Sequence, residues 1–210
     1  RITENNLQLF SFTTGMFARP FGYEINLSSS DRESTERGRM SQLFMKSERD
    51  LGAMLSFDVR KKEHPLKYLK VDAGFFIFFG ITANGDFDNI KDFIGRISLK
   101  PVSLNKSISF SGGLSILSGG LMNNTRYVYT TGTEAGIKKQ LLDSSITNSG
   151  KTSPRKYYGA DAQLKIKNKK GFTELRAEIM MGTQTGTALT SETPVSLLSG
   201  ENGFYQRKFP

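Results

Sequence analysis

The sequence predicts an all-β protein, an antiparallel transmembrane β-barrel, and three observations lead to this fold class. Strand-like runs alternate apolar and polar residues, which places the two kinds on opposite faces of a sheet. Short turns and long polar loops join these runs in alternation, as at the two ends of a membrane barrel. No run approaches the roughly 18 apolar residues that a membrane-spanning helix needs, so a helical membrane protein is excluded.

The predicted strands follow one another along the whole chain. Residues 7–17 are rich in Phe, Thr and Leu, and the breakers Arg19-Pro20-Phe21-Gly22 follow them. Asn168-Lys169-Lys170-Gly171 predicts a tight hairpin between two alternating runs. Phe204-Tyr205 begins a further strand. The period-two runs are 51–60, 69–76, 93–100, 108–116, 158–167 and 174–181.

The loops and the strand count describe a single domain over residues 1–210. About seven clear strands are an odd set, whereas single-chain bacterial barrels have even numbers. The start at Arg1, without Met or signal-peptide regions, indicates a mature or truncated chain. We therefore expect an incomplete part of a larger barrel of about 16–18 strands, with strands missing at both ends. The long loops are predicted at about 22–46, 79–91, 118–156 and 183–203.

Composition limits the chemistry. The chain has no Cys, which excludes disulfides, thiolate metal sites and cysteine nucleophiles. Its single histidine, His64, precedes Pro65 in a charged run typical of a solvated turn. Glu174 and Glu178 lie four residues apart along one strand, too far for an intimate carboxylate pair at about 3.3 Å per residue. We expect no enzyme, no cofactor and no metal site.

Charge and hydropathy fit a barrel with a wet interior. The net charge is +9, and the basic residues are dispersed, unlike the local footprint of a nucleic-acid module. We therefore expect no nucleic-acid partner, and an anionic membrane or an anion-conducting lumen instead. The mean hydropathy of −0.38 is compatible with a barrel, because only every second strand residue faces lipid.

Three segments carry a family resemblance: Gly15-Met16-Phe17-Ala18-Arg19-Pro20-Phe21-Gly22-Tyr23-Glu24, Ser47-Glu48-Arg49-Asp50-Leu51-Gly52, and Lys91-Asp92-Phe93-Ile94-Gly95-Arg96 within 86–101. In order and spacing they resemble the outer-membrane porins grouped with the phosphate-selective porins O and P, in the form common in Bacteroidetes-type bacteria. The resemblance implies a large barrel in the outer membrane of a Gram-negative cell, surrounded by its lipid and often a homotrimer. It also implies transport of anions or small solutes. Phosphate specificity does not follow, since the family's binding arginines match no individual position here.

Charged residues in the middle of the polar strand faces are the candidate pore-lining residues, because an aqueous lumen keeps such charges hydrated. They are Arg60, Lys70, Asp72, Arg96, Lys100, Asp161, Lys165, Lys167, Glu174, Arg176 and Glu178. A second set would narrow the pore if the 118–156 loop folds inward. These constriction-loop candidates are Arg126, Lys138, Lys139, Arg155 and Lys156.

The prediction is thus a porin, an anion-preferring passive diffusion channel for small hydrophilic solutes, with phosphate as one candidate. Two alternatives stay open. A barrel with a plugged pore would serve as a structural or accessory subunit of a larger envelope complex. A soluble β-sandwich binding module would also alternate, because it has one buried and one wet face, although Trp, the favoured stacking residue, is absent.

Overall fold

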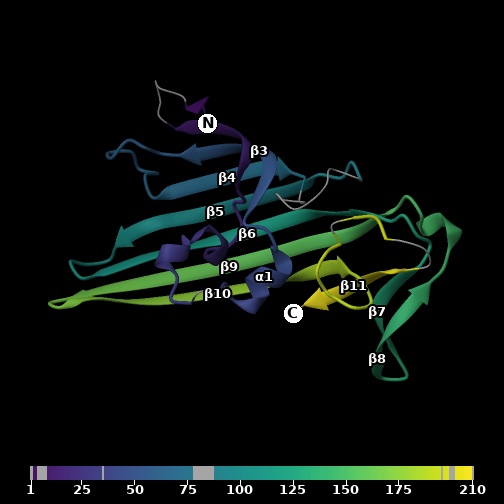
Figure 1. The fold of residues 1–210 in the computed structure, drawn as a ribbon. Coiled ribbons are helices and arrows are strands. Elements are labelled where there is room, and N and C mark those ends of the chain that lie inside the picture. Colours follow the sequence, from purple (N-terminus) through teal and green to yellow (C-terminus); the bar gives the residue numbers. More distant parts are fainter. Residues whose placement is uncertain are drawn as a thin grey trace.

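The computed structural model describes residues 2–3, 9–34, 36–77, 88–194, 196–198 and 202–209. Within them the chain forms one mostly antiparallel sheet of 11 strands, which is not closed into a barrel (Figure 1). The all-β prediction is confirmed. The helices that these residues form fall short of the length and apolar character that a membrane span needs.

Neighbouring strands of the sheet mostly follow chain order. The first part pairs in sequence and consists of β1 (Ile2–Thr3), β2 (Phe10–Ala18), β3 (Arg49–Asp58), β4 (Leu69–Phe76), β5 (Asp92–Ser103) and β6 (Ile108–Met122). It continues through β9 (Thr152–Asn168), β10 (Gly171–Gly186) and β11 (Phe204–Phe209), and then through β7 (Val128–Glu134) and β8 (Ile137–Asp143). The β11–β7 pair is parallel, and all other pairs are antiparallel.

The connections differ in length between the two ends of the sheet. Residues 59–68, 104–107 and 169–170 join strands at what we call the short-turn end. At the opposite, long-loop end lie the described parts of the longer connections: 19–34 and 36–48, 77 and 88–91, 123–151 with the β7–β8 hairpin, and 187–194, 196–198 and 202–203. The expected 79–91 loop falls largely on 78–87, outside the described residues. Residues 169–170 form the tight hairpin, with Asn168 opposite Gly171.

Two expected loops contain strands instead. Residues 118–156 include the end of β6, the β7–β8 hairpin and the start of β9, and β10 runs on to Gly186 within the expected 183–203 loop. The reason is visible in β8, all of whose residues are exposed. A strand without a buried face has no need of alternating residues, so its period-two signal is lost. Figure 1 shows this hairpin projecting from the main sheet.

The two faces of the sheet are unlike. One face, which carries Phe76, Ile94 and Leu117, is overlaid by the chain between β2 and β3; we call it the covered face. The opposite, open face is apolar across seven neighbouring strands, β2 to β6, β9 and β10. Its exposed large side chains are Phe10, Phe12, Met16, Leu51, Leu55, Phe75, Ile97, Leu99, Leu114, Ile116, Tyr158, Leu175, Ile179 and Met181.

The main core lies between the covered face and the chain from residue 19 to 48, which we call the covering segment. This segment contains the 3-10 helices η1 (Glu24–Asn26) and η2 (Ser29–Asp31) and the helix α1 (Arg39–Phe44), which lies in front of the sheet in Figure 1. Its apolar residues pack on one apolar row of the sheet. The buried residues are Phe21, Ile25, Phe44 and Met45 from the segment and Phe76, Ile94, Leu117, Tyr157 and Met180 from the strands.

Candidate functional site

Period-two alternation brings most of the candidate pore-lining residues together on the covered face. Those on this face are Lys70, Asp72, Arg96, Lys100, Asp161, Lys165, Glu174, Arg176 and Glu178, in strands β4, β5, β9 and β10. Lys167 follows in the same alternation but is exposed at the short-turn end. Arg60 lies beyond β3, and its guanidinium is 3.4 Å from the carbonyl oxygen of Phe10.

Arg96 and Asp161 form the centre of this polar surface. The Arg96 guanidinium donates to both carboxylate oxygens of Asp161, at 2.7 and 3.1 Å, and to the Ser115 hydroxyl at 2.8 Å. The Gln163 amide also donates to Asp161, at 2.7 Å. Paired charges with two-point geometry are strongly held, so Arg96 is fixed in place.

Three lysines lie nearer the short-turn end, each beside a carboxylate. The pairs are Lys70 with Asp72 at 2.8 Å, Lys100 with Asp58 at 2.5 Å, and Lys165 with Glu174 at 3.9 Å. In every pair the lysine side chain is the more exposed partner, at 31 to 39% against 3 to 23% for the acids. Lys100 also donates to the Val59 carbonyl at 3.0 Å, and the Lys165 ammonium lies 3.7 Å over the Phe172 ring.

A buried charge network lies under the covering segment, toward the long-loop end. Arg155 binds Asp92 through Nε at 3.0 Å and Nη2 at 2.7 Å, and both side chains are almost fully buried. Nearby, Arg19 lies 3.8 Å from Asp50 and donates to the Ser47 carbonyl. Burial lowers the pKa of Arg19 to about 10, although the Asp50 charge acts in the opposite direction.

Of the constriction-loop candidates, only Arg155 lies on the covered face. Arg126 is exposed beside the Tyr127 ring, 4.9 Å from its centroid. Lys138 and Lys139 are exposed on β8, and Lys156 is exposed on β9. The segment that packs on the covered face is 19–48, and of the five constriction-loop candidates Arg155 is the one buried beneath it.

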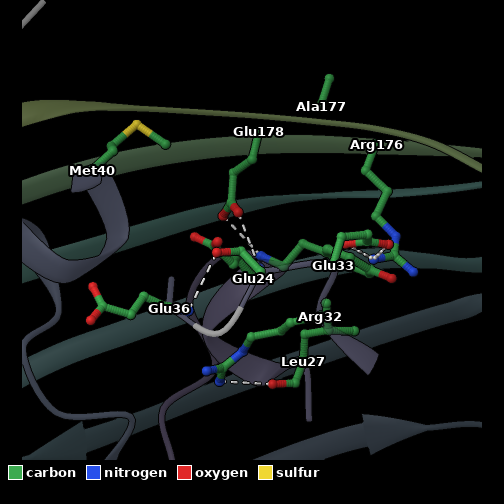
Figure 2. A pocket seen from close by; sticks show the side chains of 11 residues that line it. Glu24, Leu27, Arg32, Glu33, Glu36, Met40, Arg176, Ala177 and Glu178 are labelled. Atoms are coloured by element: carbon green, nitrogen blue, oxygen red, sulfur yellow. Dashed lines mark hydrogen bonds and ion pairs between the residues drawn. The ribbon is translucent and has the colours of Figure 1, made fainter. Parts of the chain in front are cut away.

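Glu178 holds the covering segment near its start. Its two carboxylate oxygens accept the backbone N–H groups of Tyr23 and Glu24, at 2.9 and 3.0 Å. The Arg176 guanidinium binds Glu33 of the segment at 2.8 Å. Figure 2 shows both side chains descending from β10 onto the segment. Gly22 adds a third attachment, since its N–H donates to the Ser115 hydroxyl at 3.0 Å.

Three cavities lie between the covering segment and the sheet, and Tyr23 lines all of them. The first, of about 320 Å³, is lined by the segment and β10 (Figure 2). The second, of about 250 Å³, lies over Lys70, Asp72 and Arg96. The third, of about 330 Å³, lies over Arg96, Gln163 and Lys165. Together they follow the polar surface on both sides of Tyr23.

Sequence reasoning missed the residues that attach the covering segment, notably Arg19, Tyr23, Asp50 and Asp92. A usable signal was present: Ile25, Phe44 and Met45 are apolar residues inside the long loop expected at about 22–46. Such residues require burial, which predicts that the loop packs on something. In the described part of the chain, no cluster of three or more His, Cys, Asp or Glu residues could hold a metal ion.

Comparison of the chain with family models, with curated proteins and with solved structures found no match. The functional interpretation therefore depends on the two faces of the sheet and on the cavities under the covering segment.

Proposed function

We propose that this chain forms part of the wall of an outer-membrane β-barrel that acts as a porin, a passive diffusion channel for small hydrophilic solutes with a preference for anions. One observation carries the proposal. The open face of the sheet is apolar over seven strands, whereas the covered face holds the charges and the buried ion pairs. A water-soluble sheet exposed on one side keeps its polar face toward solvent.

In the proposal, contact with lipid accounts for this inversion, in which the exposed face is apolar and the covered face is charged. Monomeric soluble proteins seldom expose large contiguous apolar patches, and barrel strands in the outer membrane alternate apolar residues toward lipid with polar residues toward the lumen. In the proposal, the open face contacts hydrocarbon and the covered face lines the lumen. Backbone groups at a sheet edge cannot stay unpaired in lipid, so further strands, about 16–18 in total, complete the barrel. A homotrimer is the assembly that the porin resemblance implies.

The exposed lysines support the anion preference. Lys70 and Lys165 line two of the cavities together with Asp72 and Glu174, and in both pairs the lysine side chain is the more exposed partner. Lys100 is also more exposed than its partner Asp58. Two unit charges about 4 Å apart interact by about 1 kcal/mol in water and several-fold more where water is partly excluded. In the proposal, the anion preference comes from the greater exposure of the lysines within these pairs, because a passing solute approaches the lysines more closely than the carboxylates.

Ionic current across a planar bilayer tests the proposal. Detergent-purified full-length protein is added under a salt gradient, and discrete conductance steps with an anion-selective reversal potential are expected. Folded, membrane-inserted protein without current would favour the second candidate, a plugged barrel serving a larger envelope complex, which the close packing of the covering segment favours. Protein that stays soluble without detergent would overturn both in favour of a β-sandwich binding module.

Charge reversal tests the lysines separately. The triple variant Lys70→Glu, Lys100→Glu, Lys165→Glu should move the reversal potential toward that of a cation-selective channel, because negative charge then faces the solute. Lys139→Glu is the matched control, since Lys139 is exposed on the β7–β8 hairpin beside Glu134. An identical reversal potential in the triple variant and the control would remove these lysines from the selectivity mechanism.

A further inference from the structure

We infer that Tyr23 is the specificity-determining residue of the passage: its ring sets the width and separates an anion path from an acidic cavity. This inference rests on the proposed porin function. The first observation is that all three cavities converge on Tyr23. Arg96 lines only two of them, so Tyr23 is the common wall.

Both the backbone and the ring of Tyr23 are held in place. Its own N–H donates to Glu178 at 2.9 Å, and the preceding residue, Gly22, donates to Ser115 at 3.0 Å. The Arg176 guanidinium lies 5.6 Å from the centroid of the Tyr23 ring, which is within the range of a cation–π contact. A side chain held in this way acts as a partition and not as a mobile flap.

The cavities on the two sides of this partition have opposite charge. The cavity of Figure 2 has more carboxylates than basic groups: Glu24, Glu33, Glu36 and Glu178 against Arg32 and Arg176. In the other two cavities the basic groups outnumber the acids, with Lys70 and Arg96 beside Asp72, and Arg96 and Lys165 beside Glu174. The neutral ring keeps a passing anion on the basic side, away from the carboxylates.

Removing the ring should therefore change two properties together. In Tyr23→Ala, the acidic cavity joins the basic ones, so unit conductance should rise and the reversal potential should shift toward that of cations. Tyr23→Phe keeps the ring and should conduct like the wild type. A rise in conductance with an unchanged reversal potential would overturn the separating role.

A cysteine at this position tests the placement in protein that has already folded and inserted. Residues 1–210 contain no Cys, so Tyr23→Cys adds the one thiol of this part of the barrel, and wild-type protein treated with the same reagent is the control. A bulky, negatively charged methanethiosulfonate reagent should reduce the current through Tyr23→Cys. Thr133→Cys, exposed on the projecting hairpin, should be labelled without loss of current.

The outcomes separate this inference from the proposed function. In one outcome, Tyr23→Ala conducts like the wild type, and Tyr23→Cys is labelled and still conducts fully. These two results together would overturn the role of Tyr23 and leave the porin proposal intact. Folded and inserted wild-type protein without current would overturn both. If Tyr23→Ala fails to fold, the reagent effect on Tyr23→Cys still decides the inference.

Discussion

At the scale of single residues, breaking the buried pair of Arg155 and Asp92 should be among the most destabilising changes. Asp92→Asn leaves the Arg155 guanidinium buried without its carboxylate, and breaking a buried pair in this way costs about 3–5 kcal/mol. The free energy of unfolding, measured by denaturant titration of the refolded protein, should fall by about that amount.

The exposed pair of Lys139 and Glu134 provides the control. Its side chains are more than half exposed, and such surface pairs contribute only about 0–1 kcal/mol. Glu134→Gln should therefore leave the unfolding free energy nearly unchanged. Equal losses in Asp92→Asn and Glu134→Gln would show that burial of the Arg155 pair adds nothing.

The pair of Arg155 and Asp92 also shows which properties of a residue a single sequence predicts. Alternation predicts which face a strand residue occupies, because the period of two is local, and it grouped Lys70, Arg96 and Glu178 on one face. It does not reveal partners. Asp92 and Arg155 come from β5 and β9, with β6 between them, and their meeting depends on the register of three strands.

At the scale of elements, Phe44 anchors the covering segment. Its ring is buried 4.6 Å from that of Tyr157 and 5.2 Å from that of Phe209, measured between centroids. Phe44→Ala should lower the free energy of unfolding by about 3–5 kcal/mol, the usual loss for a buried Phe.

Because the covering segment loosens in Phe44→Ala, trypsin should cleave this variant faster after Arg32 and Arg37. Leu189→Ala, at a side chain that is 98% exposed, should keep the wild-type cleavage rate, and equal rates in both variants would contradict the anchoring role.

The β7–β8 hairpin offers a test by pH. Hydrogen bonds from the Asn148 side chain and the Ser145 N–H lower the pKa of Asp143 below its ordinary value of 3.8. A carboxyl group with a lowered pKa stabilises the fold above its unfolded pKa, and this contribution is lost as the pH falls through the folded pKa. The Ser145 amide should therefore lose protection from hydrogen exchange below about pH 3.8. Asp143→Asn should show no such change, and a constant protection factor in the wild type would contradict the assignment.

Two elements differ in how readily the sequence predicts them. The β9–β10 hairpin has clean alternation and a tight turn chemistry, and its register holds from Gly171 opposite Asn168 to Thr183 opposite Lys156. The covering segment shows neither the period of two of a strand nor the period of 3.6 of an amphipathic helix. Its position depends on tertiary burial of Phe21, Ile25 and Phe44 and on hydrogen bonds to strands far away in the sequence, which local patterns do not contain.

At the scale of the whole molecule, the proposal that the sheet lies in a membrane rests on its two faces, one apolar and open and the other charged and covered. The covering segment packs on the covered face. The apolar open face therefore has no packing partner among the described residues of this chain. Its large side chains extend from Phe10 on β2 to Met181 on β10. A lipid environment would stabilise all of them together, whereas a binding module would need a partner as wide as the sheet.

Two leucines of equal exposure separate these explanations. Leu114, in the middle of β6, and Leu104, in a short turn, are each 65% exposed. In water, a lysine at either site would have a similar and small effect. In a bilayer, Leu114→Lys should cost roughly 2–4 kcal/mol because it places charge near the midplane, whereas Leu104→Lys near the interface should cost about 0–1 kcal/mol. Unfolding free energies measured in lipid vesicles should show this difference. Equal values for the two variants would mean that the open face does not contact hydrocarbon, and the porin proposal would then lose the observation that carries it.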